Sequence, residues 1–119
     1  MGLTEKIFKV KASYSMPDAI EVKFLIDSGA IFSLIPEVEL NKIGIVSYKT
    51  MDFYLADGTK ITRRVGDAYF EYQGEGGAAP VVFGEEGDMP LLGATALEAC
   101  TLVLNPYKRE LYPMRHITL

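Results

Sequence analysis

The apolar and polar positions near the start of the chain alternate in the way that is typical of a β-hairpin. Residues 6–13 (KIFKVKAS) alternate along most of their length, and residues 19–26 (AIEVKFLI) alternate before they end in an apolar triplet. A period of two residues indicates a strand with one face buried. The dipeptide Pro17-Asp18 between the two segments favours a turn. We therefore predict two paired strands here.

A second hairpin is predicted in the middle of the chain. Residues 48–55 and 59–65 are strand-like, and the dipeptide Asp57-Gly58 lies between them. Asp-Gly is a strong hairpin signal, because both residues tolerate a positive φ. We expect this hairpin to project from the body of the protein, with its tip formed by Ala56, Asp57, Gly58 and Thr59.

The rest of the chain predicts short strands and little helix. Further strand-like segments are residues 67–72, 80–83, 101–104 and 109–112. The first two are expected to pair across a glycine-rich turn at residues 73–77. Residues 94–100 (ATALEAC) predict a helix of about two turns, and Pro36-Glu37 favours one short helical turn. Many short strands with one short helix predict an all-β barrel or sandwich.

The composition limits the kind of protein that the chain can form. Its 119 residues have the usual length of one domain, so we expect a single domain over residues 1–119. Hydrophobic residues make up 49% and charged residues 24%, which is ordinary globular usage and argues against disorder. The net charge is −4 and no basic block is longer than Arg63-Arg64, so nucleic acid is not an expected partner.

The numbers of cysteines and histidines and the length of the apolar runs indicate where in the cell the protein is expected and whether it could bind a metal ion. The lone Cys100 cannot form an internal disulfide, which favours a reducing cytoplasm. No apolar run approaches the roughly 20 residues that span a bilayer, so no membrane association is expected. His116 is the one histidine, and with a single cysteine it offers no ligand set for a metal ion. We expect a cytoplasmic protein without a metal or cofactor.

Candidate chemistry lies in residues 24–30 (FLIDSGA), an apolar strand that carries an aspartate into a tight turn. A D-[S/T]-G tripeptide occurs by chance in roughly one chain in twenty of this length, so alone it favours a simple Asx-turn. The order of three features changes this interpretation. The strand ending in Asp-Ser-Gly-Ala is followed by a glycine-tipped hairpin, and Leu91-Leu92-Gly93 then leads to a short helix and a final strand.

This order resembles the retropepsin-like aspartic proteases, the single-domain relatives of pepsin, over about residues 22–111. The strings FLIDSGA and MPLLGATALEACTLVLNP are similar to those of the bacterial and archaeal members. The resemblance implies an all-β fold, the retropepsin-like acid protease barrel with one short C-terminal helix, which is one half of a pepsin-type bilobe. It also implies an aspartic endopeptidase.

The resemblance assigns roles to particular residues. Asp27 would be the catalytic carboxylate, with Ser28 and Gly29 shaping the turn that holds it. Ala30 would leave room for the substrate backbone. The hairpin tip would close over a bound peptide, which makes its four residues substrate-binding: Ala56, Asp57, Gly58 and Thr59. Segments near both termini would contribute strands to a subunit interface.

One aspartate does not suffice for this mechanism. Two carboxylates about 3 Å apart cannot both ionise comfortably, so they share a proton. The ionised one takes a proton from water while the protonated one donates to the developing oxyanion. Because the chain has one D-[S/T]-G, the second carboxylate must be a twofold-related Asp27. The expected partners are thus a second copy of the chain and a peptide or protein substrate.

Departures from the retroviral pattern leave other functions open. Retroviral members often pair an acidic residue after the catalytic triplet with an arginine after the apolar-Gly element, and here those places hold Ile31-Phe32 and Ala94-Thr95. The hairpin tip also has one clear glycine, Gly58. One alternative is a catalytically weak or inactive dimeric peptide-binding or scaffold module. Another is a β-barrel ligand-binding protein in which Asp-Ser-Gly is only a turn.

Overall fold

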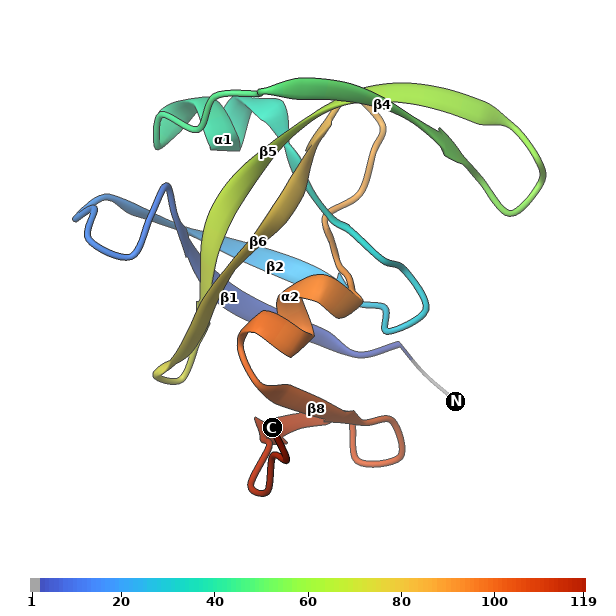
Figure 1. Ribbon diagram of the computed structural model, residues 1–119. Coiled ribbons are helices and arrows are strands. Elements are labelled where there is room, and N and C mark those ends of the chain that lie inside the picture. The colour runs from blue at the N-terminus through green and yellow to red at the C-terminus, as the bar shows by residue number, and fades with distance from the viewer. Residues whose placement is uncertain (1–2) are drawn as a thin grey trace.

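The alternating segments become the strands of a seven-stranded sheet in the computed structural model, which describes residues 3–119 (Figure 1). Its strands are β1 (Glu5–Lys11), β2 (Ala19–Ile26), β3 (Ser33–Pro36), β4 (Lys49–Tyr54), β5 (Lys60–Tyr72), β6 (Glu75–Gly84) and β7 (Leu91–Leu92). The remaining elements are a two-stranded sheet and two helices: β8 (Leu102–Asn105), β9 (Glu110–Pro113), α1 (Glu37–Lys42) and α2 (Ala94–Ala99). The all-β prediction is confirmed.

The large sheet closes on itself into a barrel. Its strand order is β1-β2-β7-β3-β6-β5-β4, and β1 also pairs with β5. Strand β5 is long enough to pair with three other strands. Its first part pairs with β4, and its second part pairs with β6 and β1. Six strands therefore form the closed barrel, while β4 extends β5 away from it (Figure 1).

The barrel encloses an aromatic core. Alternation along the predicted strands directs one face inward, and four phenylalanines on it are at most 2% exposed: Phe8, Phe24, Phe70 and Phe83. The ring of Phe24 packs edge-on against Phe8, with centroids 5.7 Å apart, and lies 6.1 Å from Phe70. Each such buried side chain stabilises the fold by about 1.5–3 kcal/mol. The first hairpin and β5 are thus joined by the core that the sequence pattern predicted.

The central hairpin is formed as predicted. Strands β4 and β5 pair from Lys49 with Val65 to Tyr54 with Lys60, and they extend beyond the barrel (Figure 1). At the tip, Gly58 has a φ of 85° and donates its amide to the Leu55 carbonyl at 2.9 Å. Asp57 keeps a negative φ and its carboxylate accepts the Thr59 amide at 2.9 Å. The glycine alone supplies the left-handed position of this turn.

The next turn is shorter than predicted. It is confined to Gln73 and Gly74, both with positive φ, and β6 begins at Glu75. A Cβ atom at Gly77 would lie 2.2 Å from the carbonyl oxygen of Ala99, the last residue of α2. Glycine in this strand therefore permits the helix to pack on β6, which is a tertiary requirement and not a turn signal.

Between residues 31 and 40, sequence reasoning found the helix and missed the strand. The short helix predicted at Pro36-Glu37 is α1, and the predicted C-terminal helix is α2. Strand β3, however, was not predicted, because its four residues are too short to show alternation. It pairs in parallel with β6, from Ser33 with Val81 to Pro36 with Gly84.

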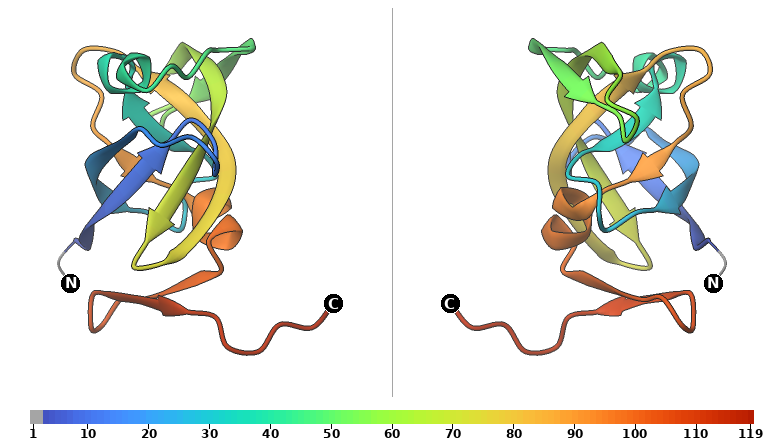
Figure 2. Two further views of the ribbon diagram at one scale, coloured as in Figure 1. Left: turned by 90° about the vertical axis from the view of Figure 1, so that its left-hand side faces the viewer. Right: turned by 90° about the vertical axis from the view of Figure 1, so that its right-hand side faces the viewer.

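The C-terminal hairpin lies outside the barrel. Strands β8 and β9 form their own sheet, and the tail after Pro113 runs away from the body of the protein (Figure 2). The start of β1 lies at this same end, whereas the β4–β5 hairpin lies at the other (Figures 1 and 2). Tyr107, Tyr112 and Ile117 in this region are exposed. In the described part of the chain, no helix is long and apolar enough to cross a membrane.

Burial predicts that Cys100 is chemically inert in the folded protein. The thiol is 1% exposed at the end of α2, and burial raises its pKa to about 11. Because the thiolate is the nucleophile, we expect a thiol reagent at pH 8 to label the native protein roughly a hundredfold more slowly than the unfolded protein. Labelling kinetics followed by mass spectrometry, with and without urea, check this. Equal rates in the two states would contradict it.

Candidate active site

Strand β7 is inserted between two strands that are consecutive in the sequence. It pairs in parallel with the end of β2, Leu25 with Leu91 and Ile26 with Leu92, and antiparallel with β3. The Asp27 amide continues this ladder by donating to the Leu92 carbonyl at 2.9 Å. On the other side of β2, the Ile26 amide donates to the carbonyl of Thr4 at 2.8 Å. The aspartate therefore leaves the sheet at a point where the backbone is held from both sides.

The residues after Asp27 form a tight turn around its side chain. The Gly29 amide donates to the Asp27 Oδ1 at 3.0 Å, and the Ala30 amide donates to the Asp27 carbonyl at 3.2 Å. A Cβ atom at Gly29 would lie 3.3 Å from the same Oδ1. Asp27 is half-buried, while Ser28 and Gly29 are exposed. The Asx-turn expected of the tripeptide is therefore present, and it leaves the second carboxylate oxygen of Asp27 free of the turn.

The start of α2 fastens the far side of this turn. The Ala94 amide donates to the Ala30 carbonyl at 2.7 Å. Thr95 donates twice to the Ile31 carbonyl, from its amide at 3.1 Å and its hydroxyl at 2.7 Å. These are the positions at which the retroviral ion pair is missing from the sequence. Neutral hydrogen bonds join the two segments here instead.

Ser33 is a site residue that sequence reasoning missed. Its side chain is fully buried, and its Oγ accepts the amide of Gly93 at 2.9 Å. A Cβ atom at Gly93 would lie 2.5 Å from the Phe32 carbonyl oxygen and 2.9 Å from that of Ala30. Glycine thus lets β7 and α2 approach the turn closely. The signal in the sequence was a single serine within an otherwise apolar run, IFSLIP.

An apolar groove of about 530 Å³ opens beside the turn. Gly29 and Ala30 form one edge of it, and Phe32 and Leu34 continue that wall. The strands of the hairpin supply the facing wall, with Met51 and Phe53 from β4 and Ile61 from β5. Met89 and Leu91 line it from the loop before α2. Its volume lies within the usual range of a ligand site, and Asp52 is its one charged lining residue among residues 3–119.

The hairpin tip lies outside this groove. Ala56, Asp57, Gly58 and Thr59 are exposed, and they are not part of the groove lining within residues 3–119. The strands behind the tip line the groove instead, and the ring of Phe53 packs edge-on against Phe32 with centroids 5.9 Å apart. Of the predicted substrate-binding residues, the structure places Ala30 in the groove wall. Figure 2 shows the turn at residues 27–32 below the projecting hairpin in its right-hand view.

Other features offer less for chemistry. A hollow of about 580 Å³ over β1, β2 and the β5–β6 turn is lined mainly by lysines and glutamates, and no residue of the turn at residues 27–30 borders it. Within residues 3–119, no three His, Cys, Asp or Glu side chains gather in a way that would hold a metal ion. The turn that carries Asp27 and borders the apolar groove through Gly29 and Ala30 is therefore the arrangement with the clearest chemical use.

Comparison with known proteins identifies the fold. The structure is similar to the solution structure of the protease of simian foamy virus (mac), with a TM-score of 0.53 and 23% sequence identity. The similarity covers 82% of this chain and 92% of the viral one. The fold is retropepsin-like. No protein-family model and no curated protein matches the sequence.

The similarity establishes the fold of the barrel that carries the Asp27 turn, but it does not assign an activity to Asp27. The turn, the inserted β7 and α2 all belong to the described barrel, and the expectation of this fold from the order of three motifs is confirmed. The foamy virus protein is a protease, and what that implies for this chain is a matter of proposal. The roles of Asp27, Ser28 and Gly29 stay predictions.

The buried bond between Ser33 and Gly93 yields a stability prediction. Ser33→Ala removes the acceptor and leaves the buried Gly93 amide without a partner, so we expect unfolding to become easier by about 1–3 kcal/mol. Urea denaturation measures this change. Ser13→Ala is the matched control, because Ser13 is exposed, and it should change stability by no more than about 0.5 kcal/mol. Equal stability of the two variants would show that the bond does not hold the turn.

Proposed function

We propose that the chain is an aspartic endopeptidase that acts as a homodimer. The observation that carries this proposal is the position of Asp27, at the end of β2 in a tight turn that borders an apolar groove under a projecting hairpin. An acid at the edge of a groove can serve a substrate that lies in it. The likeness of the fold to that of a viral protease supports the proposal.

A second copy of the chain supplies what one copy lacks. Peptide hydrolysis without a metal needs one group that accepts a proton from water and another that donates to the carbonyl oxygen. The chain has a single D-[S/T]-G, so the second carboxylate is a twofold-related Asp27 in this proposal. The start of β1 and the exposed β8–β9 hairpin, which lie at one end of the molecule, are the segments proposed for the subunit interface.

The proposed reaction begins with a water molecule held between the two Asp27 carboxylates. The ionised carboxylate removes a proton from this water as its oxygen attacks the scissile carbonyl carbon. The other carboxyl group gives its proton to the carbonyl oxygen, which becomes a hydroxyl of a tetrahedral intermediate. When the C–N bond breaks, the amine leaves with a proton returned from the pair. No metal or cofactor is needed.

The neighbouring residues have proposed supporting roles. Ser28 and Gly29 shape the turn, and the Gly29 amide orients the Asp27 carboxylate by its bond to Oδ1. Ala30 leaves room for the peptide backbone at the edge of the groove. The tip at residues 56–59 closes over the peptide when it is bound, because it lies beyond the last paired residues of β4 and β5 and is exposed, so it can bend toward the groove.

Finer parts of the proposal rest on the sequence. We infer a single domain of the bacterial or archaeal type from the strings FLIDSGA and MPLLGATALEACTLVLNP, and a cytoplasmic location from the lone cysteine. Nucleic acid and membranes are not proposed as partners, because the net charge of the chain is small and negative.

The decisive substitution is Asp27→Asn, which keeps the size of the side chain and removes its acid. We expect kcat/KM for cleavage of an unfolded protein at mildly acidic pH to fall by roughly 10³ or more. Sedimentation should show that the dimer is retained, since Asn preserves most of the hydrogen bonding. Asp18→Asn is the control, because Asp18 lies in the exposed loop between β1 and β2, and it should cleave like the parent protein.

Three outcomes would contradict the proposal. Equal cleavage by the Asp27→Asn variant would exclude Asp27 as the catalytic acid. Peptide binding without any hydrolysis by the parent protein would favour the scaffold module. A stable monomer in every condition would favour a ligand-binding barrel in which the motif is a turn.

A further inference from the structure

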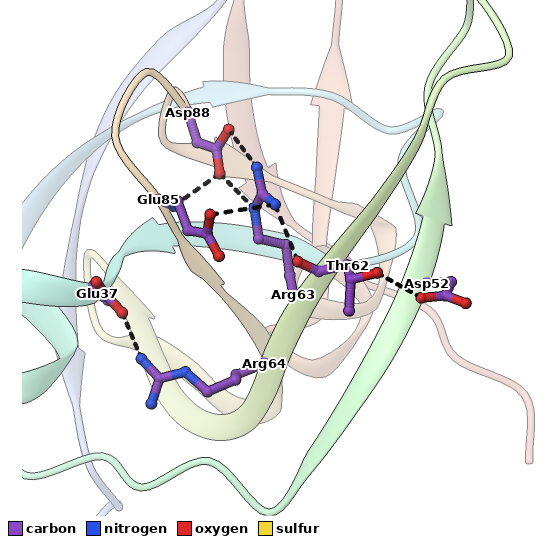
Figure 3. A network of polar contacts seen from close by, with 7 residues as sticks. All are labelled: Glu37, Asp52, Thr62, Arg63, Arg64, Glu85 and Asp88. Atoms are coloured by element: carbon purple, nitrogen blue, oxygen red, sulfur yellow. Dashed lines mark hydrogen bonds and ion pairs between the residues drawn. The ribbon is translucent and has the colours of Figure 1, made fainter.

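An ion pair joins Arg63 in the β4–β5 hairpin to Asp88 in the loop at residues 85–90 (Figure 3). The Arg63 Nε donates to the Asp88 Oδ2 at 2.8 Å, and its Nη2 donates to the Asp88 Oδ1 at 3.3 Å. The two side chains are only 14% and 19% exposed. A two-point, mostly covered pair of this kind fixes geometry far better than an exposed pair does.

Asp88 also shapes its own loop. Its Oδ2 accepts the amide of Glu85 at 2.8 Å, and its own amide donates to the Glu85 carbonyl at 2.9 Å. The guanidinium of Arg63 reaches the other end of the turn, since its Nη1 lies 3.5 Å from the Glu85 Oε1. These bonds to Arg63 hold the pKa of Asp88 below its ordinary value, so the carboxylate is charged at neutral pH. One cation thus fastens both ends of the turn.

The pair connects two walls of the apolar groove. Arg63 lies opposite Met51 in the β4–β5 ladder, so both side chains are on the face of the hairpin that borders the groove. Asp88 directly precedes Met89, which lines the groove from the loop. A shift of the ion pair would therefore move the hairpin wall and the Met89 wall relative to each other.

Apart from its Pro90 carbonyl, which accepts the Leu25 amide at 3.3 Å, this loop has few other contacts among the described residues. Glu85, Glu86 and Gly87 are exposed, and Met89 is 76% exposed. On the side that faces α1, a hollow of about 490 Å³ separates the loop from Pro36, Glu37 and Val38. Apolar packing therefore cannot hold the loop in place, and its position depends on polar contacts.

Two other ion pairs of the hairpin differ from this one. Arg64 pairs with Glu37, and Lys60 pairs with Asp52, but in each case both side chains are at least 42% exposed. Such exposed pairs contribute little to stability, because water screens their charges. They provide a natural comparison for the covered pair.

We propose that Arg63 and Asp88 form a clasp that sets the width of the apolar groove by holding Met89 at a fixed distance from the hairpin. In this proposal Arg63 is a positioning residue for substrate selection: it acts through Met89 and does not contact the reacting atoms. The inference rests on the proposed function only in taking the groove as the place where substrate side chains bind. The clasp itself can be tested without any catalysis.

The first test is amide hydrogen exchange of the Arg63→Met variant, which keeps an unbranched, flexible side chain and removes its charge and donors. We expect exchange at residues 85–91 to become roughly tenfold faster or more than in the parent protein, after correction for any change in global stability. Asp88→Asn should give the same local effect and guards against misfolding of the first variant. Lys60→Met, which breaks an exposed pair on the same strand, should leave these amides within about twofold.

Methionine methyl groups report the groove directly. In protein labelled with ¹³C at the methionine ε-methyl group, Arg63→Met and Asp88→Asn should shift the resonance of Met89 and, more weakly, that of Met51. Met16 in the β1–β2 loop and Met114 after β9 are internal references that should not move. The residue introduced at position 63 adds one new signal, which Arg63→Gln identifies by its absence.

The functional test compares two peptides that differ in the size of one apolar side chain. For the larger peptide, Arg63→Met should raise KM by roughly tenfold while kcat stays within about twofold, and Arg63→Lys should restore only part of the loss, because one ammonium cannot serve both Asp88 oxygens. If the parent protein cleaves neither peptide, only the proposed function fails, and Kd replaces KM in this comparison. Unchanged exchange at residues 85–91 in both Arg63→Met and Asp88→Asn would overturn the clasp in either case.

Discussion

The insertion of β7 between β2 and β3 is the constraint on which the rest of the molecule depends. The two outer strands are neighbours in the sequence, but they cannot pair with each other because Leu91 and Leu92, which come much later in the chain, occupy the place between them. The turn that carries Asp27 must therefore arch over the end of β7. Its backbone bonds go to Leu92 below and to the start of α2 beside it, which satisfies groups that would otherwise be buried without partners.

This arrangement leaves no room for a side chain at position 93 and needs a hydrogen-bond acceptor at position 33. Gly93 lies so close to the carbonyls of Ala30 and Phe32 that a single added carbon would collide with both. Ser33 is buried because its hydroxyl is the acceptor that the Gly93 amide needs. Both residues break the local apolar pattern for a reason that exists only after the chain is folded. Such conflicts between pattern and position are expected where a site is built.

The elements that line the apolar groove differ in how strongly the rest of the structure holds them in place. One wall belongs to the barrel, where Phe32 and Leu34 follow the anchored turn. The facing wall belongs to a hairpin that is joined to the barrel through β5, and the third belongs to a loop with little apolar packing. The edge-on contact of Phe53 with Phe32 and the bonds of Arg63 to Asp88 link these elements. A peptide site whose shape depends on a few such links can be tuned by single residues without altering the barrel.

The sequence by itself determined most of the strands, though not β3 or β7, together with the two short helices, the projecting hairpin and the placement of Asp27 at the end of an apolar strand. These are local properties: alternation, turn dipeptides and helix propensity act over a few residues. Strand β3, the glycines of β6, the role of Ser33 and the clasp of Arg63 with Asp88 were decided only by the tertiary structure. Their partners lie about 20 to 60 residues away in the chain, and no local pattern encodes a contact across such a separation. The hairpin tip shows the same division: its turn follows from the local Asp-Gly dipeptide, whereas its position outside the groove depends on how the barrel holds the strands.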